Sequence, residues 1–247
     1  MCYHDAKDFY LSDLLAYYEL AGQARIPEEV KLIETRFYHN NGFDHNLLPV
    51  LAKPDDIGMM FWGLIPWYTK TVSDAMHIRN QTLNAISEEM YEKPSYRDSL
   101  KEGKRCLVPV TGFFEWQWQD KAGKAKQPYY IHLKDQKIFS LAGIYSSWKN
   151  PDTGELVYTY SVLTTRANPL MERIHNNKKR MPVIIVQQFE KDWLNPNLTK
   201  DDVLAFCQPF DEAKMDAHTI SKRITSKKDP TNVPEVTQKV DSGLLFE

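Results

Sequence analysis

The sequence has little cysteine. Cys2, Cys106 and Cys207 are the only three cysteines in 247 residues. Their odd number and the lack of any C-x-x-C spacing argue against a disulfide framework and against a zinc site. We therefore expect a protein of a reducing compartment, without a bound metal or other cofactor.

Long apolar runs are also missing. No segment approaches the run of about 18 apolar residues that a membrane-spanning helix needs. The N-terminal stretch MCYHDAKDFY has no apolar core of the kind found in a signal peptide. These absences predict a cytoplasmic protein that does not enter a membrane.

An excess of charge of either sign is absent as well. The 31 basic and 33 acidic side chains leave a net charge of −2, so a nucleic-acid partner would need a local basic groove. The chain is 42% hydrophobic and shows no internal repeat and no long linker. It is long enough for one sizeable core. We expect a monomer with a single domain over residues 1–240 and a frayed tail over 241–247.

Apolar periodicity and breaker residues predict both helices and strands. Residues 37–50, which include Asn40-Asn41-Gly42, are typical of an irregular segment that ends in a short strand. Helices are expected at 6–21, from Pro27 onward, at 87–100 with a break at Pro94, at 188–193 and at 200–206. Strands are expected at 47–52, 105–110, 129–133, 137–148, 156–165 and 181–186, with edge strands at 217–221 and 233–240. Those at 129–165 are joined by short turns, which favours an antiparallel meander.

Cys2 has chemistry open to it that internal cysteines lack. Trimming of Met1 would leave a cysteine with both a free α-amine and a thiol, whose ordinary pKa values lie near ~8 and ~8.5. An aldehyde can form an imine with that amine and then take the thiolate, which closes a five-membered thiazolidine. A second residue without any special role is the alternative.

Three further polar residues stand against apolar or aromatic neighbours. Glu115, between Phe114 and Trp116, is either turned to solvent by strand alternation or desolvated, with a raised pKa suited to acid–base work. His175 is either a structural hydrogen-bonding residue or a proton carrier. Asn84 either caps a following helix or holds an amine or a substrate oxygen.

Two segments carry features of a nucleic-acid surface. Trp67 and Tyr68 follow Pro66 at the end of a strand, where they either pack in the core or stack on bases. After His175, a polar loop supplies the cations Lys178, Lys179 and Arg180, which are candidate phosphate ligands.

Five ordered segments resemble the motifs of the SOS-response-associated peptidase (SRAP) family. They are Cys2 after Met1, WGLIP at 62–66, NAISEEMYEKPSYR at 84–97, RCLVPVTGFFEW at 105–116 and IHNNKKRMPVIIV at 174–186. The resemblance extends from residue 2 to about residue 240. It implies a single α+β domain with an antiparallel β-barrel-like core flanked by helices.

The resemblance also implies a function. Family members bind single-stranded DNA and capture abasic sites through a thiazolidine on the N-terminal cysteine, and they can remove residue 1. Carried over to this sequence, Cys2 is the nucleophile, Asn84 helps to position it, Glu115 is the acid–base catalyst and His175 assists ring opening. Slow lyase or reversal activity would use the same groups.

The chain lacks two arginines of the family pattern. Members commonly begin Cys-Gly-Arg and contain Asn-Ala-Arg, whereas this sequence has Cys2-Tyr3-His4 and Asn84-Ala85-Ile86. We expect the longer basic loop after His175 to take over part of the phosphate contact. Two alternatives stay open from the residues alone: a thiol peptidase that uses Cys2, His175 and Asn84, and a non-covalent single-strand binder.

Overall fold

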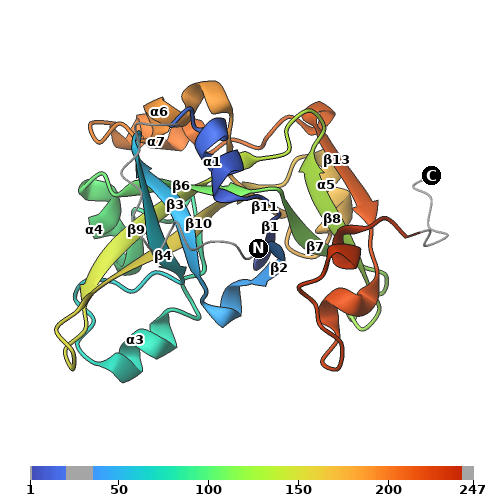
Figure 1. The fold of residues 1–247 in the computed structure, drawn as a ribbon, viewed down its shortest axis with the longest axis horizontal. Helices are drawn as coiled ribbons and strands as arrows, with labels where there is room; N and C mark the ends of the chain where they lie inside the picture. The colour runs from blue at the N-terminus through green and yellow to red at the C-terminus, as the bar shows by residue number, and fades with distance from the viewer. Residues whose placement is uncertain (1, 21–35, 241–247) are drawn as a thin grey trace.

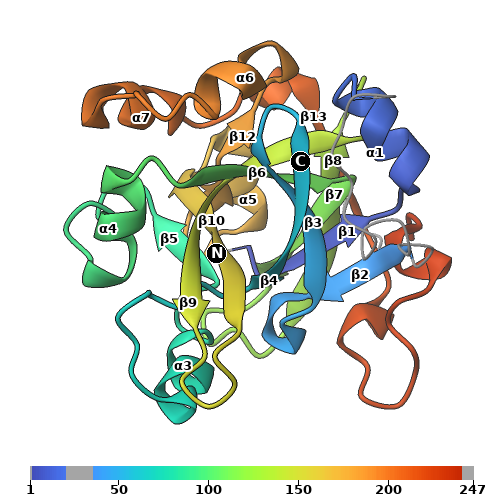
Figure 2. The same ribbon diagram turned by 60° about the vertical axis from the view of Figure 1, so that its left-hand side comes forward.

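A closed five-stranded barrel lies within the larger, eight-stranded sheet of the computed structural model, which describes residues 2–20 and 36–240. Its strands follow one another around the ring in the order β10-β4-β3-β6-β9, and β9 pairs with β10 to close it (Figure 1). Their bounds are β3 Leu47–Lys53, β4 Asp56–Trp62, β6 Arg105–Val110, β9 Phe139–Lys149 and β10 Leu156–Arg166. Figure 2 looks onto β3, β9 and β10.

The barrel is mixed, which corrects the expectation of an antiparallel core. Strand β10 runs parallel to β4 and to the short strand β5 (Asn84–Ile86), while its pairing with β9 is antiparallel. The parallel pairings join segments far apart in sequence, so no turn signal could reveal them. The α+β class and the single domain with a barrel core are confirmed. The boundary at residue 240 stays a prediction, because 241–247 lie outside the described residues.

A second sheet of five strands lies beside the barrel, in the order β13-β8-β7-β1-β2. It contains β1 His4–Lys7, β2 Phe37–Asn41, β7 Gly112–Trp118, β8 Lys126–Leu133 and β13 Met215–Thr219. The predicted meander is therefore wrong in part. Strands β8 and β9 are consecutive but belong to different sheets, so of the three strands β8, β9 and β10 only the last two pair with each other as a hairpin. Likewise, β2 replaces the first part of the predicted loop.

Helices cover the ends and flanks of the strands. They are α1 Leu11–Tyr17, α3 Val72–Ile78, α4 Pro94–Lys101, α5 Pro169–Ile174, α6 Glu190–Trp193 and α7 Lys200–Phe206. In Figure 1, α6 and α7 lie at the top of the barrel and α3 at the bottom. Short 3-10 turns occur at Gly42–Asp44, Gln187–Phe189, Glu212–Lys214, Lys222–Thr225 and Pro234–Thr237, and the strand pieces β11 Arg180–Pro182 and β12 Ile184–Ile185 lie beside β10 and β9.

Local chemistry explains several helix boundaries. Helix α4 begins at Pro94 instead of breaking there, because a proline at the first helical position loses no intrahelical hydrogen bond. The helix predicted from residue 6 begins only at Leu11, because residues 4–7 form β1. The helix predicted from Pro27 lies outside the described residues. None of the helices within 2–20 and 36–240 has the length and apolar character needed to cross a bilayer.

Candidate active site

Cys2 is fully buried just before strand β1. Its side chain belongs to an apolar cluster that includes Phe113, Tyr160 and Ile174, and its thiol donates to the carbonyl oxygen of His4 at 3.7 Å. Burial raises the pKa of the Cys2 thiol well above its usual value, and the charge of Glu115 raises it further. The thiol is thus neutral until a nearby base takes its proton.

Glu115 faces the same interior from β7. It pairs with Tyr129 of β8, and strand alternation puts its side chain on the opposite face from Phe114 and Trp116. Its side chain is 5% exposed, so the solvent-facing alternative is wrong. Burial raises the pKa of Glu115 to about 7, where a carboxyl group can both take and give a proton near neutral pH.

His175 ends helix α5 and points at Glu115. Its Nδ1 lies 3.6 Å from Oε1 of Glu115 and 2.9 Å from the carbonyl oxygen of Arg180. A carbonyl only accepts, so Nδ1 of the neutral ring carries the proton and Nε2 is left as the basic nitrogen. Burial lowers the pKa of His175 to about 4, which keeps the ring neutral at pH 7.

Asn84 lies in β5, paired with Val162, so it does not cap a helix. It is buried, and neither polar atom of its side-chain amide has a hydrogen-bond partner among the described residues. Buried amides are normally satisfied, so this one is available to a ligand oxygen or amine.

The chain segments around Asn84 and Cys2 meet at Gly42. A Cβ atom on Gly42 would lie 3.2 Å from the carbonyl oxygen of Tyr3 and 3.3 Å from Cδ2 of Leu83. Tyr3 and Leu83 are the chain neighbours of Cys2 and Asn84. The fold thus brings the segment of Asn84 to the segment of the nucleophile candidate, while Glu115 and His175 approach from β7 and α5.

The predicted basic loop is attached to β7. The side chain of Asn176 accepts from the Trp118 amide and donates to the Trp118 carbonyl, both at 3.0 Å, as a neighbouring strand would. Lys178 and Lys179 are exposed on this loop, and Lys179 lies 3.8 Å from Glu172. Both lysines are therefore accessible to an anionic ligand.

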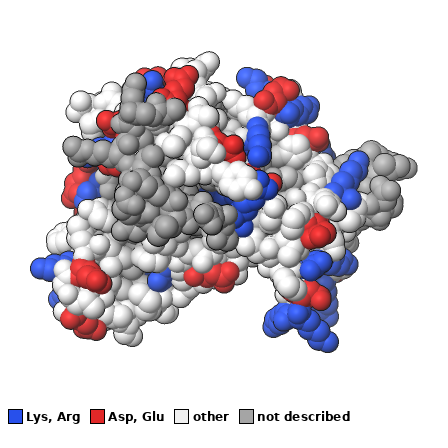
Figure 3. Space-filling view, in the orientation of Figure 1, with Lys and Arg blue, Asp and Glu red and all other residues white. Residues whose placement is uncertain are grey.

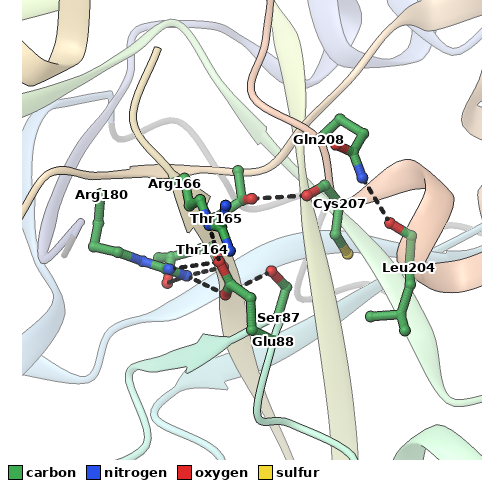
Figure 4. Close-up of polar contacts among 9 residues, drawn as sticks. All are labelled: Ser87, Glu88, Thr164, Thr165, Arg166, Arg180, Leu204, Cys207 and Gln208. Carbon is green, nitrogen blue, oxygen red and sulfur yellow. Dashed lines mark hydrogen bonds and ion pairs between the residues drawn. The ribbon is translucent and has the colours of Figure 1, made fainter.

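Arg180 differs from these lysines. Its guanidinium donates to both carboxylate oxygens of Glu88 at 2.8 Å and also to the carbonyl oxygen of Thr164 (Figure 4). Its side chain is only 15% exposed. A bidentate pair of this kind fixes the fork of the arginine, so a phosphate would have to compete with Glu88.

Trp67 and Tyr68 lie at the surface between β4 and α3. They are 59% and 40% exposed, so plain core packing is wrong for both. Their rings meet edge to face at 5.9 Å, and Trp67 donates to a carboxylate oxygen of Asp98 at 3.0 Å. The pair offers a rigid aromatic surface to a ligand.

Sequence reasoning missed two groups near Cys2. Tyr3 packs against the exposed ring of Phe43, with the ring centroids 5.2 Å apart, and Asp5 forms a buried ion pair with Lys7. Phe43 follows an Asn-Asn-Gly turn and carried no pattern of its own. Alternation in β1 places Asp5 and Lys7 on one face, but the apolar spacing of the sequence predicts a helix from residue 6, which includes Lys7.

The charges do not form one dominant basic surface on the face shown in Figure 3, where blue and red groups are interspersed among white. Within residues 2–20 and 36–240, no three His, Cys, Asp or Glu side chains are grouped to hold a metal ion.

A buried thiol, a carboxyl group with a pKa near neutral, a neutral imidazole and an unpartnered amide are groups that nucleophilic and acid–base chemistry can use, and all four belong to this α+β barrel protein. The chain belongs to the family described as SOS response associated peptidase (SRAP), which matches residues 16–227.

Similar proteins span most of the chain. The abasic site processing protein YoqW of Bacillus subtilis is 37% identical over 203 residues, which cover 81% of this chain and 85% of YoqW. The abasic site processing protein HMCES of Xenopus tropicalis is 31% identical, over 72% of this chain and 56% of its own length.

Among solved structures, a crystal structure of a protein from Bacteroides thetaiotaomicron superposes with a TM-score of 0.89 at 39% identity, and covers 97% of this chain and 100% of its own. A Bordetella bronchiseptica protein has a TM-score of 0.70 at 21% identity, with 89% of this chain and all of the other covered, and shows the shared fold.

Proposed function

We propose that the protein captures abasic sites in single-stranded DNA through a thiazolidine on Cys2. The observation that carries this proposal is the buried Glu115, whose pKa is raised to about 7, which lies 3.6 Å from His175 and whose charge acts on the buried thiol of Cys2. The names of YoqW and HMCES, both abasic site processing proteins, support the same substrate.

The nucleophile requires removal of Met1, since only then does Cys2 carry a free α-amine. The same site would perform this removal. Glu115 or His175 accepts the proton of the Cys2 thiol, which attacks the Met1 carbonyl carbon; the Cys2 nitrogen leaves with that proton, and water then hydrolyses the thioester and releases Met1. The family name, which includes the word peptidase, fits such a self-directed step.

Capture then proceeds by ring opening, imine formation and thiazolidine closure. The deoxyribose of an abasic site is mostly a closed hemiacetal. Neutral His175 takes the hemiacetal hydroxyl proton and delivers a proton to the ring oxygen as the ring C–O bond breaks, which opens the sugar to an aldehyde and a free hydroxyl group. The Cys2 amine adds to the aldehyde carbon, and Glu115 carries two protons in turn from the nitrogen to the carbinolamine oxygen, which leaves as water and gives the imine. The thiolate attacks the imine carbon, and the nitrogen takes up a proton.

The free amide of Asn84 would position the reacting groups. Its side chain can accept from the α-amine and donate to a sugar oxygen. Trp67 and Tyr68 would stack on neighbouring bases, and Lys178 and Lys179 would contact phosphates. Arg180 can join them only if it exchanges Glu88 for a phosphate. Reversal of the ring closure, or β-elimination from the imine, would use Glu115 and His175 again.

The decisive experiment incubates the purified protein with single-stranded DNA that carries one abasic site, followed by denaturing electrophoresis. We expect an adduct that survives denaturation, and that is lost in Cys2→Ala and in a chain that retains Met1. Intact mass measures Met1 removal directly. A retained Met1 in the wild-type chain, or an adduct that persists in Cys2→Ala, contradicts the proposal.

The same assay separates the two alternatives. A thiol peptidase would cleave added peptides and leave no adduct on DNA. A non-covalent binder would shift the DNA in a native gel but leave no species after denaturation.

A further inference from the structure

The loop from His175 to Arg180 folds back onto the histidine ring. The amide of Lys179 donates to the carbonyl oxygen of His175 at 2.8 Å, and the ring Nδ1 of His175 donates to the carbonyl oxygen of Arg180 at 2.9 Å. Lys179 has a φ of 49°, in the left-handed region that costs a residue other than glycine conformational energy. The loop is therefore a strained turn whose last carbonyl group selects the tautomer of the histidine.

Glu88 anchors the far end of this loop. Its two carboxylate oxygens accept from the Arg180 guanidinium at 2.8 Å each, and the same guanidinium donates to the carbonyl oxygen of Thr164 at 2.6 Å (Figure 4). The amide of Ser87, the residue before Glu88, donates to that carbonyl oxygen at 2.9 Å. Two hydrogen bonds to one carboxylate and a third to the backbone of β10 hold the arginine in one orientation.

The near end of the loop is fixed from a different strand. Asn176 bonds to both backbone groups of Trp118 in β7, the strand that also carries Glu115. The near end thus follows β7, and the far end follows the segment of Glu88 just after β5. A strained turn persists only while its surroundings hold it, so loss of the far anchor lets its backbone relax.

The tautomer of His175 decides which ring nitrogen can act as a base. With the proton on Nδ1, the ring offers Nε2. With the proton on Nε2, the lone pair of Nδ1 would face the carbonyl oxygen of Arg180, which is an acceptor as well. An imidazole in the wrong tautomer cannot take a proton from the substrate, so the rate falls although the residue is present. Whatever holds the Arg180 carbonyl group in place therefore prepares the base.

We propose that Glu88 is a positioning residue for His175 and acts through Arg180. The carboxylate holds the guanidinium, the guanidinium holds the end of the loop, and the loop keeps the Arg180 carbonyl oxygen against Nδ1. The inference rests on the proposed function for the reaction in which His175 is the base. Glu88 needs no contact with DNA for this role.

The direct test is the tautomer of His175 in the full-length chain, measured by long-range ¹H–¹⁵N correlation spectra of protein labelled at histidine. The signals are assigned with His175→Gln. We expect the proton on Nδ1 in the wild type and a mixture of both tautomers in Glu88→Gln, which keeps the shape of the side chain but loses its charge and one acceptor. The chain has seven histidines, and the signals of the others report whether the fold is intact.

Glu172→Gln is the matched control. Glu172 lies 3.8 Å from Lys179, so this variant removes a different ion pair of the same loop. Its His175 should keep the proton on Nδ1, as in the wild type.

The kinetics of adduct formation with abasic single-stranded DNA give a second readout. At saturating DNA, Glu88→Gln should slow the reaction by about 10- to 100-fold, the range found when a group that orients a metal-bound histidine is removed. The DNA concentration at half the maximal rate should not rise, because Arg180 released from Glu88 can contact a phosphate. A merely structural Glu88 would lower the stability and leave both the tautomer and the saturated rate unchanged.

A proton that stays on Nδ1 in Glu88→Gln overturns the inference, and so does a wild-type rate in a variant with mixed tautomers. If Glu88→Gln fails to fold, Arg180→Lys takes its place, because lysine cannot bond to both oxygens of Glu88. Failure of the proposed function gives a different pattern: the wild-type chain then forms no adduct, while the tautomer still changes in Glu88→Gln.

Discussion

Nδ1 of His175 lies 3.6 Å from Oε1 of Glu115, and burial moves the pKa values of the two groups past each other. The carboxyl group rises to about 7 and the imidazole falls to about 4, the reverse of their ordinary order. At neutral pH the ring is therefore neutral while the carboxyl group exchanges protons. Groups whose surroundings separate their pKa values in this way are suited to distinct acid and base roles.

Glu115→Gln should slow adduct formation by roughly 10²- to 10⁴-fold, the usual contribution of general acid–base catalysis. The wild-type rate should change with pH around the Glu115 pKa of about 7, and this dependence should be absent from the variant. Single-turnover rates with abasic single-stranded DNA between pH 5.5 and 8.5 provide the measurement.

Glu190→Gln is the matched control for that variant. Glu190 is likewise buried, but it accepts from Tyr17 at 2.7 Å, away from the cluster of Cys2. Its variant should retain the wild-type rate and pH profile. An equal loss in both variants would contradict a specific role for Glu115.

Replacement of Lys178 and Lys179 by alanine should weaken DNA binding and flatten its salt dependence. Each lost phosphate contact on a single strand lowers the slope of log K against log salt by about 0.7, so about 1.4 is expected for two. Binding titrations at several salt concentrations measure the slope. The control is the double variant Lys227→Ala/Lys228→Ala, which removes two other exposed lysines. An unchanged slope in the variant that lacks Lys178 and Lys179 would refute their role in phosphate binding.

Trp67→Ala should weaken binding to single-stranded DNA by about 1–3 kcal/mol, the range for one base stacked on an aromatic ring. Its stability should change little, because the ring is 59% exposed. Fluorescence anisotropy with labelled DNA and thermal melting give the two quantities. Phe189→Ala removes another exposed ring, 44% exposed, and should not affect binding. Equal affinities of Trp67→Ala and wild type would argue against stacking.

Arg180→Lys should destabilise the fold by about 1 kcal/mol, since lysine cannot hold both oxygens of Glu88. The figure is discounted because the Glu88 side chain is 37% exposed and partly screened by water. Arg166→Lys is the control, as that guanidinium is 84% exposed and lies 3.9 Å from Glu88. Urea unfolding compares them. A loss of DNA affinity without a loss of stability would instead assign Arg180 to phosphate binding.

Acid should destabilise the fold through His39. Burial lowers the pKa of His39 to about 4, whereas its pKa in the unfolded chain is near 6.5. Neutral His39 therefore stabilises the fold fully above about pH 6.5, and this stability is lost as the pH falls through about 4. Between pH 4.5 and 6, His39 makes the free energy of unfolding rise with pH. His39→Gln should therefore lower the slope of that rise by up to about 1.4 kcal/mol per pH unit.

Glu115→Gln supplies the comparison of opposite sign. Because its pKa is raised, Glu115 stabilises the fold fully below about pH 4.5, and this stability is lost as the pH rises through about 7. Glu115→Gln should therefore make the free energy of unfolding rise more steeply with pH. Urea unfolding at a series of pH values measures both. Slopes that change in the same direction would contradict the assigned shifts.

The sequence alone determined the family and the residue types of the site. The motif at 105–116 predicts a strand that delivers Glu115, and the motif at 174–186 predicts His175 before a basic loop. These are local features, because a strand pattern and a polar loop are written in neighbouring residues. The family resemblance then supplied Cys2 and Asn84, which local patterns left open.

Only the tertiary structure decided how these residues are used. Whether Glu115 meets solvent or the interior depends on what packs against β7, and burial beside Cys2 moved its pKa to about 7. The structure likewise pairs Arg180 with Glu88 and buries Lys7 with Asp5. The sequence shows these four residues only as charged side chains, without their partners. Desolvation and ion pairing depend on three-dimensional contacts. Strands such as β5 and β10 make these contacts between residues far apart in the sequence, which no local hydrophobic pattern predicts.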